Sequence, residues 1–274
     1  MKKFVIIMGV FLLLVSCSTQ NGNQQYESFV SGNTENVTEE SVSVTEEPES
    51  DLLTDAPESV VIPEETLPPL HSELFIPGLD VEDVINYFNE VCLDGEIING
   101  GDPSFVQKWV SPIKYSLNGE MTEEDKIFLN KFCDYLNTID GFPGISYSEN
   151  DFNLRIYFCN QDYMKALMSE DLAENDGAVT FWYDNDIIYD AIICYRTDIE
   201  QSVRNSVIIE EIYNGLGPIQ DTSLREDSII YSGYSTPQWI TEIDELIIKL
   251  LYNPKIKCGM NSVECESVIR ELYY

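Results

Sequence analysis

The chain has 274 residues, of which 49 are acidic and 15 are basic, and its formal net charge is −34 at pH 7. This length allows one sizeable domain with accessory segments. The charge argues against nucleic acid as a partner, because binding phosphate groups requires a basic surface. It also argues against a domain that lies flat on anionic lipid. We interpret the charge as a source of solubility and mutual repulsion, and it indicates no specific ligand.

Residues 1–16 have the pattern of an export signal. Two lysines precede an apolar run over 4–15, which is too short to span a bilayer comfortably. The run ends in Leu14-Val15-Ser16-Cys17, which resembles the lipobox of bacterial lipoproteins. That resemblance implies that Cys17 is lipidated, becomes the mature N-terminus and anchors the chain to the outer side of the bacterial cell membrane. An ordinary cleaved signal peptide or a membrane stub is the alternative.

Residues 17–72 are predicted to form an acidic, disordered tether. The segment 18–70 is rich in Ser, Thr, Glu, Asn and Pro and contains no Lys or Arg. Such a composition cannot bury enough apolar surface to offset the entropy of ordering. A tail that folds on a partner is the alternative. His71, the only histidine of the chain, lies at the end of this segment and is expected to be incidental, without a role as a ligand.

A globular domain is predicted over 73–274, and its first half contains two helices and two strands. Apolar residues at helical spacing predict a helix over 80–92, and a strand is expected over 111–119. A helix over 122–139 follows, with Thr122 as its cap and acidic residues in its first turn. A further strand is predicted over 153–160.

The second half begins with a hairpin pattern over 177–196, whose turn is expected at Asp184-Asn185-Asp186. A helix is predicted from about 199 to 216, with Asp198 and Gln201 forming a box-like start. Helices near 240–252 and 261–273 end the domain. Strands interleaved with helices predict an α+β domain with a mixed sheet.

The cysteines offer no metal-binding spacing, because no C-x-x-C occurs in the chain. Cys133, Cys159 and Cys194 lie inside apolar, periodic segments and are expected to be buried thiols. Cys258 and Cys265 are close in sequence and could form a disulfide bridge.

The segment 207–217 reads VIIEEIYNGLG and carries the candidate site. Glu210 and Asn214 are one helical turn apart and share a face, with Glu211 beside them. The segment has the outline of H-E-x-x-H, in which two histidines hold zinc and the glutamate handles the proton of a water molecule. Carboxylates and carboxamides bind zinc poorly and suit harder cations. An ordinary amphipathic helix with a polar stripe is the alternative.

The segments after this helix resemble a metzincin metallopeptidase of the matrixin type, in which a third histidine, a turn containing Met and a final helix follow the motif. The resemblance places Glu210, Asn214 and Gln220 at the three ligand positions, with Asp221 next to them, and Glu211 at the general-base position. Ile230 stands at the Met of the turn, and Tyr231 and Tyr234 keep its aromatic residues. A metzincin-like or zincin-like mixed sheet with a central helix of the active-site type and C-terminal helices is therefore expected. The histidines are absent, so no zinc and no other cofactor is expected.

A closer resemblance is to a family of bacterial lipoproteins and exported proteins known only as a domain of unknown function. It rests on Glu210-Glu211 with Leu216-Gly217, on Asp227-Ser228-Ile229, and on a tail from Ile240 to Met260 that includes Leu250-Leu251-Tyr252. The likeness covers about residues 81–262. The family implies no activity.

Three functions remain open at this point. The first is an anchored binding domain that has lost peptidase activity and holds a protein, peptide or glycan. The second is a hydrolase in which Glu210 and Glu211 act as an acid/base pair, or hold a hard cation with Asn214 and Asp221. The third is a structural protein of the cell envelope.

Overall fold

The computed structural model describes residues 76–93, 105–168, 170, 172–233 and 237–274. The predicted signal segment, the whole predicted tether with Cys17 and His71, and Tyr234 lie outside these ranges. Within them, no helix has the length and apolar composition that a membrane crossing requires.

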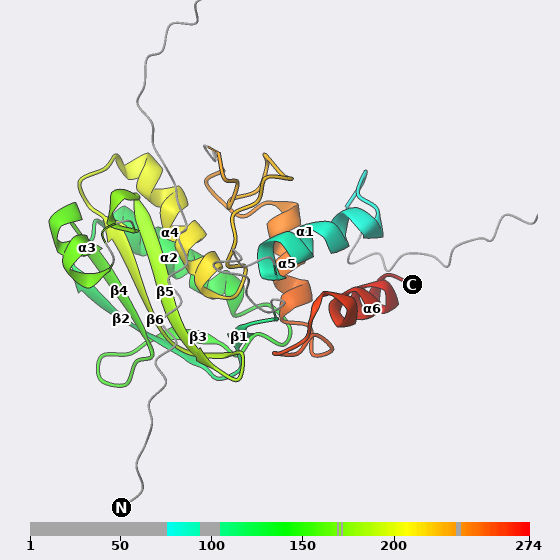
Figure 1. Ribbon diagram of the computed structural model, residues 1–274. Helices are drawn as coiled ribbons and strands as arrows, with labels where there is room; N and C mark the ends of the chain where they lie inside the picture. Colours follow the sequence, from blue (N-terminus) through cyan, green and yellow to red (C-terminus); the bar gives the residue numbers. More distant parts are fainter. Residues whose placement is uncertain (1–75, 94–104, 169, 171, 234–236) are drawn as a thin grey trace, which may run out of the picture. The chain divides into compact units, whose positions relative to one another are not determined.

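The domain is α+β, with six α-helices among the described residues and a mostly parallel central sheet (Figure 1). In chain order the elements are α1 (Val81–Leu93), β1 (Lys108–Trp109), β2 (Ile113–Gly119), α2 (Glu123–Leu136), β3 (Ile145–Tyr147), β4 (Leu154–Cys159), α3 (Gln161–Leu167), a short 3₁₀ helix (Leu172–Glu174), β5 (Gly177–Asp184), β6 (Ile187–Arg196), α4 (Gln201–Gly215), α5 (Glu242–Leu251) and α6 (Ser262–Tyr273).

The sheet has the order β1-β6-β4-β2-β3, and β5 pairs with β6 in the antiparallel direction. The predicted mixed sheet is therefore confirmed. Residues at alternate positions face opposite sides, as the pleat requires. One face carries buried apolar side chains such as Ile156, Phe158 and Ile193 and packs against α2 and α4. The other face, which we call the outer face, carries the intervening residues of β2, β4 and β6.

The predicted hairpin is present, and its turn is tighter than expected. Only Asn185 and Asp186 connect β5 to β6, with φ angles of 49° and 61°. Two successive residues with positive φ are typical of the two-residue turn that matches the twist of a hairpin, and Asn and Asp tolerate this conformation best among residues other than glycine.

The start of α2 was predicted correctly, whereas the start of α4 was not. Thr122 caps α2 and forms a reciprocal capping box with Asp125. The residue before α4 is Glu200, which makes no side-chain cap hydrogen bond. Asp198 does not cap α4, because its carboxylate accepts hydrogen bonds from Arg196. The side chain of Gln201 instead donates hydrogen bonds to the carboxylate of Asp125 and to the side-chain oxygen of Asn205.

The six cysteines among the described residues are free thiols. Cys133, Cys159 and Cys194 are buried, as predicted. The suggested bridge between Cys258 and Cys265 is absent. Cys265 is buried within α6, whereas the sulfur of Cys258 lies 3.6 Å from the carbonyl oxygen of Lys108.

The segment 251–260, near the C-terminus, contacts the start of β1 and the residues just before it. The amide of Val106 donates to the carbonyl of Met260 at 2.9 Å, and the amide of Gly259 donates back at 3.0 Å. The buried ammonium of Lys108 donates to the carbonyl oxygens of Leu251 and Ile256, each at 2.6 Å. These contacts join segments about 150 residues apart in the chain.

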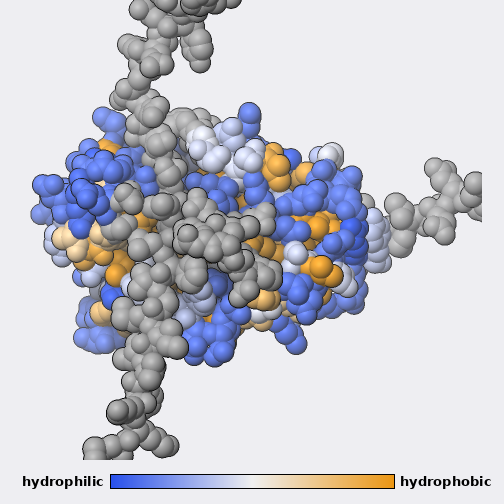
Figure 2. All heavy atoms as spheres, in the orientation of Figure 1, coloured by the Kyte–Doolittle hydropathy of each residue, from blue (hydrophilic) through white to orange (hydrophobic). Residues whose placement is uncertain are grey.

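Hydrophilic residues cover most of the described surface that Figure 2 shows, with apolar residues scattered among them. This distribution agrees with the strongly acidic composition.

Candidate functional site

The candidate site lies at the C-terminal end of α4. The sequence predicts one apolar face and one polar stripe for this helix, but every residue from Arg204 to Gly215 is buried. The sheet covers one side, where the hydroxyl of Tyr195 donates to the carbonyl of Ile208 at 2.9 Å. The start of α5 covers another, where the hydroxyl of Tyr213 donates to the carbonyl of Asp244 at 2.9 Å. The polar residues of α4 are therefore inside the protein.

Glu211 is fully buried, and neither of its carboxyl oxygens has a hydrogen-bond partner among the described residues. It packs against the first residue of β5, Gly177. A Cβ atom on Gly177 would lie 2.8 Å from Cγ of Glu211 and 2.3 Å from a methyl group of Val207. Only glycine therefore allows the strand to pass this close to the helix.

Asn214 shares the face of Glu210 and Glu211, one turn further along the helix. It is also fully buried, and within the described ranges neither its Oδ1 nor its Nδ2 atom has a hydrogen-bond partner. Glu210 is 3% exposed. Unsatisfied buried polar atoms cost free energy and are rare in folded proteins, so each requires an explanation such as a bound group, a water molecule or a chemical role.

Asp221 follows α4 in the next loop and approaches the same group. Its Oδ1 atom is buried and has no hydrogen-bond partner in the part of the chain that the structure describes. Burial raises the pKa of Asp221 to about 7. Burial also raises the pKa of Glu211 well above its usual value, and the charges of Glu210 and Asp221 add to the effect. Both carboxyl groups therefore tend to keep a proton at a pH where ordinary carboxyl groups are ionised.

The structure brings some of the remaining predicted residues near this group. Gln220 is half-buried, and its backbone amide donates to the carbonyl of Val91 at 3.2 Å. Ile230 is fully buried, and its carbonyl accepts from the amide of Thr222 at 2.8 Å. Tyr231 is half-buried and pairs with Thr222 in an isolated bridge. The predicted turn therefore runs beside the loop that carries Asp221.

A buried network fixes this turn, and nothing but its residue types could be read from the sequence. The hydroxyl of Tyr87 donates to Oγ of Ser228 at 2.7 Å, and that hydroxyl donates to Oδ1 of Asp244 at 2.7 Å. The amide of Ile229 donates to the other oxygen of Asp244 at 3.1 Å. Helix α1, the turn and α5 are thus held together, and the turn has one fixed position beside the site.

The donor set is made of oxygen atoms and one carboxamide nitrogen, without imidazole or thiolate. Zinc prefers nitrogen and sulfur ligands, whereas oxygen atoms suit harder cations. Among the described residues, no three side chains of His, Cys, Asp or Glu converge so as to hold a metal ion. The arrangement as it stands can hold and release protons in a low-dielectric interior.

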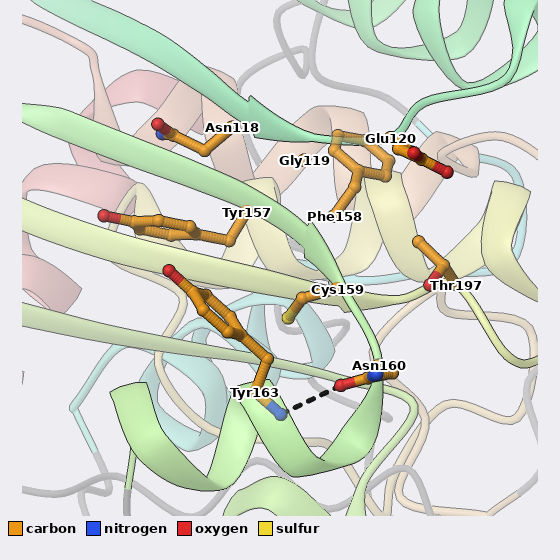
Figure 3. A pocket seen from close by; sticks show the side chains of 9 residues that line it. All are labelled: Asn118, Gly119, Glu120, Tyr157, Phe158, Cys159, Asn160, Tyr163 and Thr197. Atoms are coloured by element: carbon orange, nitrogen blue, oxygen red, sulfur yellow. Dashed lines mark hydrogen bonds between the residues drawn. The ribbon is translucent and has the colours of Figure 1, made fainter.

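A second feature, absent from the sequence interpretation, is a cavity of about 530 Å³ at the carboxyl ends of β2 and β4 (Figure 3). In open α/β sheets, ligands bind at this end of the strands. The rings of Tyr157 and Tyr163 lie beside one another, with centroids 6.3 Å apart, and Asn118 lies on the other side of Tyr157. The lining residues are Asn118, Gly119, Glu120, Tyr157, Phe158, Cys159, Asn160, Tyr163 and Thr197. They include aromatic, amide, thiol and carboxylate groups.

Comparison with known proteins finds one family. A family model described as "Protein of unknown function (DUF2927)" matches residues 81–271. No curated protein and no solved structure matches the chain.

Proposed function

The chain belongs to the DUF2927 family, and from that premise we propose that it is a lipid-anchored bacterial binding protein whose domain is metzincin-like but does not cleave peptide bonds. The proposal has three parts: an anchor at Cys17, a fold derived from a metallopeptidase, and a task of binding a protein, peptide or glycan.

The order of the elements supports the metzincin-like part. The helix with the three positions Glu210, Glu211 and Asn214 directly follows the last strand of a mixed sheet. A turn with Ile230 and Tyr231 comes next, and a helix, α5, follows it. This is the order that the sequence resemblance implies for that fold.

One observation supports the proposed loss of peptidase activity. The residues at the positions of two zinc ligands and the general base, Glu210, Asn214 and Glu211, are 3%, 0% and 0% exposed. A scissile carbonyl must come within about 3 Å of the catalytic groups. Side chains packed this deeply cannot meet a peptide bond unless α4 and β5 separate.

A direct assay tests this part. The full chain, solubilised in detergent, is incubated with denatured casein and with a fluorogenic peptide library, with and without a chelator. We expect no cleavage above a buffer blank. Cleavage that the chelator abolishes, or stoichiometric zinc in protein purified without chelators, would contradict the proposal.

The cavity at the ends of β2 and β4 is the place on the described surface that we propose for the ligand. The aromatic faces of Tyr157 and Tyr163 offer stacking surface, and Asn118 and Glu120 offer polar groups that fix orientation. A glycan and peptide array probed with the full chain tests this part. Tyr163→Ala should lower the array signal, whereas Tyr189→Ala, an equally exposed tyrosine outside the cavity lining, should not. Equal signals would remove the cavity from the proposal.

The anchor has its own test. Cys17→Ser should move the protein from the membrane fraction to the soluble fraction of a cell that processes lipoproteins. Retention in the membrane would favour an uncleaved stub.

A second candidate, a hydrolase that acts only when α4 and β5 separate, is favoured by one specific observation. Burial raises the pKa of Asp221 to about 7 and that of Glu211 well above its usual value, which suits general acid/base catalysis near neutral pH. If the domain hydrolyses any ester, amide or glycoside, Glu211→Gln should reduce kcat about 100-fold or more. Glu242→Gln, which changes an exposed carboxylate on α5, is the matched control. A hydrolytic activity that Glu211→Gln leaves unchanged would exclude this role.

A further inference from the structure

Two thiols lie together on the outer face of the sheet, and the metallopeptidase resemblance does not involve them. Cys159 is the last residue of β4, and Cys194 lies on the neighbouring parallel strand β6. Cys194 is the register partner of Tyr157, so it stands on the same face as Cys159 and diagonally across from it. Both thiols belong to one small apolar cluster with Met164, Leu172, Ala173 and Ala178.

The two thiols have unequal access to solvent. Cys159 is 9% exposed and lines the 530 Å³ cavity next to Tyr163 (Figure 3), whereas Cys194 is 0% exposed and is not among the lining residues. The interaction between the two thiols lowers the pKa of Cys159 and raises that of Cys194. The thiol that faces the cavity is therefore the one that more readily becomes a thiolate, and the buried thiol keeps its proton.

From this juxtaposition we propose that Cys159 and Cys194 form a thiol–disulfide exchange site, in which Cys159 attacks a small disulfide that enters the cavity and Cys194 resolves the product. The arrangement combines a sulfur that lines the cavity, a second thiol diagonally across from it in the same apolar cluster, and a cavity that the reagent can enter.

The exchange is balanced in two steps. In the first, the Cys159 thiolate attacks a disulfide R–S–S–R, the S–S bond breaks, and one R–S⁻ leaves while Cys159–S–S–R forms. In the second, Cys194 passes its proton to the R–S⁻ released in the first step, its thiolate attacks the sulfur of Cys159, and the second R–S⁻ leaves and takes a proton from water. Two protein thiols are oxidised to one disulfide, and the reagent is reduced to two thiols.

The register predicts that the resulting disulfide is easily reduced. Adjacent parallel strands lie about 4.8 Å apart and rise about 3.3 Å per residue, so diagonal neighbours two residues along have Cα atoms about 8 Å apart. Disulfides usually need Cα atoms within about 7 Å, and bridging a longer distance requires backbone movement. Strained disulfides are the ones that are reduced most easily. The pair is therefore suited to reversible exchange and poorly suited to being a permanent cross-link.

The test uses the full chain in its reduced, folded state with glutathione disulfide as the probe, followed by peptide mapping in a mass spectrometer. The wild-type protein should yield a Cys159–Cys194 disulfide, which dithiothreitol reverses. Cys194→Ser should instead accumulate a mixed disulfide with glutathione on Cys159. Cys159→Ser should leave Cys194 unmodified, and Cys133→Ser, which removes a buried thiol of α2, should behave as the wild type does.

A second measurement needs no variant that could misfold. Iodoacetamide at pH 7 should alkylate Cys159 at least about tenfold faster than Cys133 in the native wild-type protein, because the thiolate is the reactive form. The proposal is overturned if Cys159 reacts no faster than Cys133, or if the Cys159–Cys194 disulfide forms only in denaturant. It is also overturned if Cys194→Ser fails to trap glutathione. None of these results depends on whether the cavity binds a glycan or a peptide.

Discussion

Helix α4 carries a buried polar cluster at each end, and the two clusters differ in how their polar atoms are satisfied. At the N-terminal end, Arg204 donates to Asp125 of α2 at 2.8 Å and to Gln201 at 2.6 Å. Gln201 also donates to Asp125 at 2.7 Å, and Asn205 donates to Glu124 at 2.7 Å. The charges of Arg204 and Asp125 are buried, paired and hydrogen-bonded.

At the C-terminal end, Glu211, Asn214 and Asp221 all have buried polar atoms with no hydrogen-bond partner in the described part of the chain. Arg204 and Asp125 of the first cluster are 5% and 0% exposed, and Glu211 and Asn214 of the second are both 0% exposed. Because a buried polar atom without a partner costs free energy, packing and stability cannot explain the second cluster as they explain the first. The first cluster joins α4 to α2, whereas the second is the one where a chemical or binding role is expected.

The largest predicted effect comes from breaking the cluster at the N-terminal end of α4, in which Arg204 and Asp125 are paired. Arg204→Met should lower the free energy of unfolding by about 3–5 kcal/mol, because Asp125 would be left as an unpaired buried charge. Urea denaturation followed by circular dichroism measures it. Lys126→Met is the control, since the ion pair of Lys126 with Glu123 is exposed and such pairs contribute about 0–1 kcal/mol.

A double variant sharpens the interpretation. Arg204→Met combined with Asp125→Leu removes both charges and should recover part of the loss. If the double variant is less stable than Arg204→Met alone, the unpaired charge is not the cause.

The second prediction uses pH to separate the two ends. The pKa of Asp221 is about 7 in the fold against 3.8 ordinarily, so its contribution to stability is fully present below about pH 4 and is lost as the pH rises through 7. When the pH is lowered from 7.5 to 4.5, the free energy of unfolding of the wild type should rise by about 2 kcal/mol relative to that of Asp221→Asn. This figure is lower than 1.36 kcal/mol per pKa unit would give, because solvent screens a partly buried carboxyl group. Unfolding in urea at both pH values measures the difference. Asp227→Asn, an exposed change on the same loop, should follow the wild-type profile.

Asp125 should respond in the opposite direction. Burial tends to raise the pKa of Asp125, but hydrogen bonds from Arg204 and Gln201 outweigh burial and leave it below 3.8. Its contribution is therefore present above pH 3.8 and lost as the pH falls through the folded pKa. If both ends gained stability on acidification to pH 3, the contrast between them would be wrong.

The smallest predicted effect concerns the N-terminal caps of α2 and α4, the two helices joined by the cluster of Arg204 and Asp125. Thr122→Ala should cost about 1 kcal/mol, because Thr122 caps α2 and its hydroxyl also donates to Gln201 at 2.9 Å. Glu200→Ala at the start of α4 should change stability by less than about 0.5 kcal/mol, since Glu200 makes no cap hydrogen bond. Thermal unfolding of both variants gives the comparison, which fails if Glu200→Ala costs as much as Thr122→Ala.

Local chemistry made part of this fold predictable from the sequence. The Asn185-Asp186 turn, the cap at Thr122 and the helical stripes of α2, α5 and α6 all depend on residues that are neighbours in the chain. The elements that the sequence did not reveal are short and depend on distant partners. Strand β1 has two residues, and Lys108 pairs with Ile187 of β6. Strand β3 has three residues, and α3 has seven.

The residues of the candidate site could be predicted from the sequence, but their surroundings could not. Helical spacing was enough to group Glu210, Glu211 and Asn214. Their burial was not predictable, because it comes from β5, from the turn after α4 and from α5, which contact α4 only in the folded chain. The position of Gly177 against Glu211 is one such contact, and no local pattern announces it. The network of Asp125 and Arg204 was missed for the same reason, since its two charges lie 79 residues apart.

The return of the C-terminal segment to β1 has a consequence for how the protein is made. A ribosome delivers Val106 and Lys108 early, but the carbonyl groups that receive their hydrogen bonds belong to Leu251, Ile256 and Met260. The backbone of Val106 and the ammonium group of Lys108 therefore lack these partners until the segment 251–260 has been synthesised. Prematurely terminated products that stop before Leu251 cannot bury Lys108 with its partners, which would mark them for proteolytic clearance.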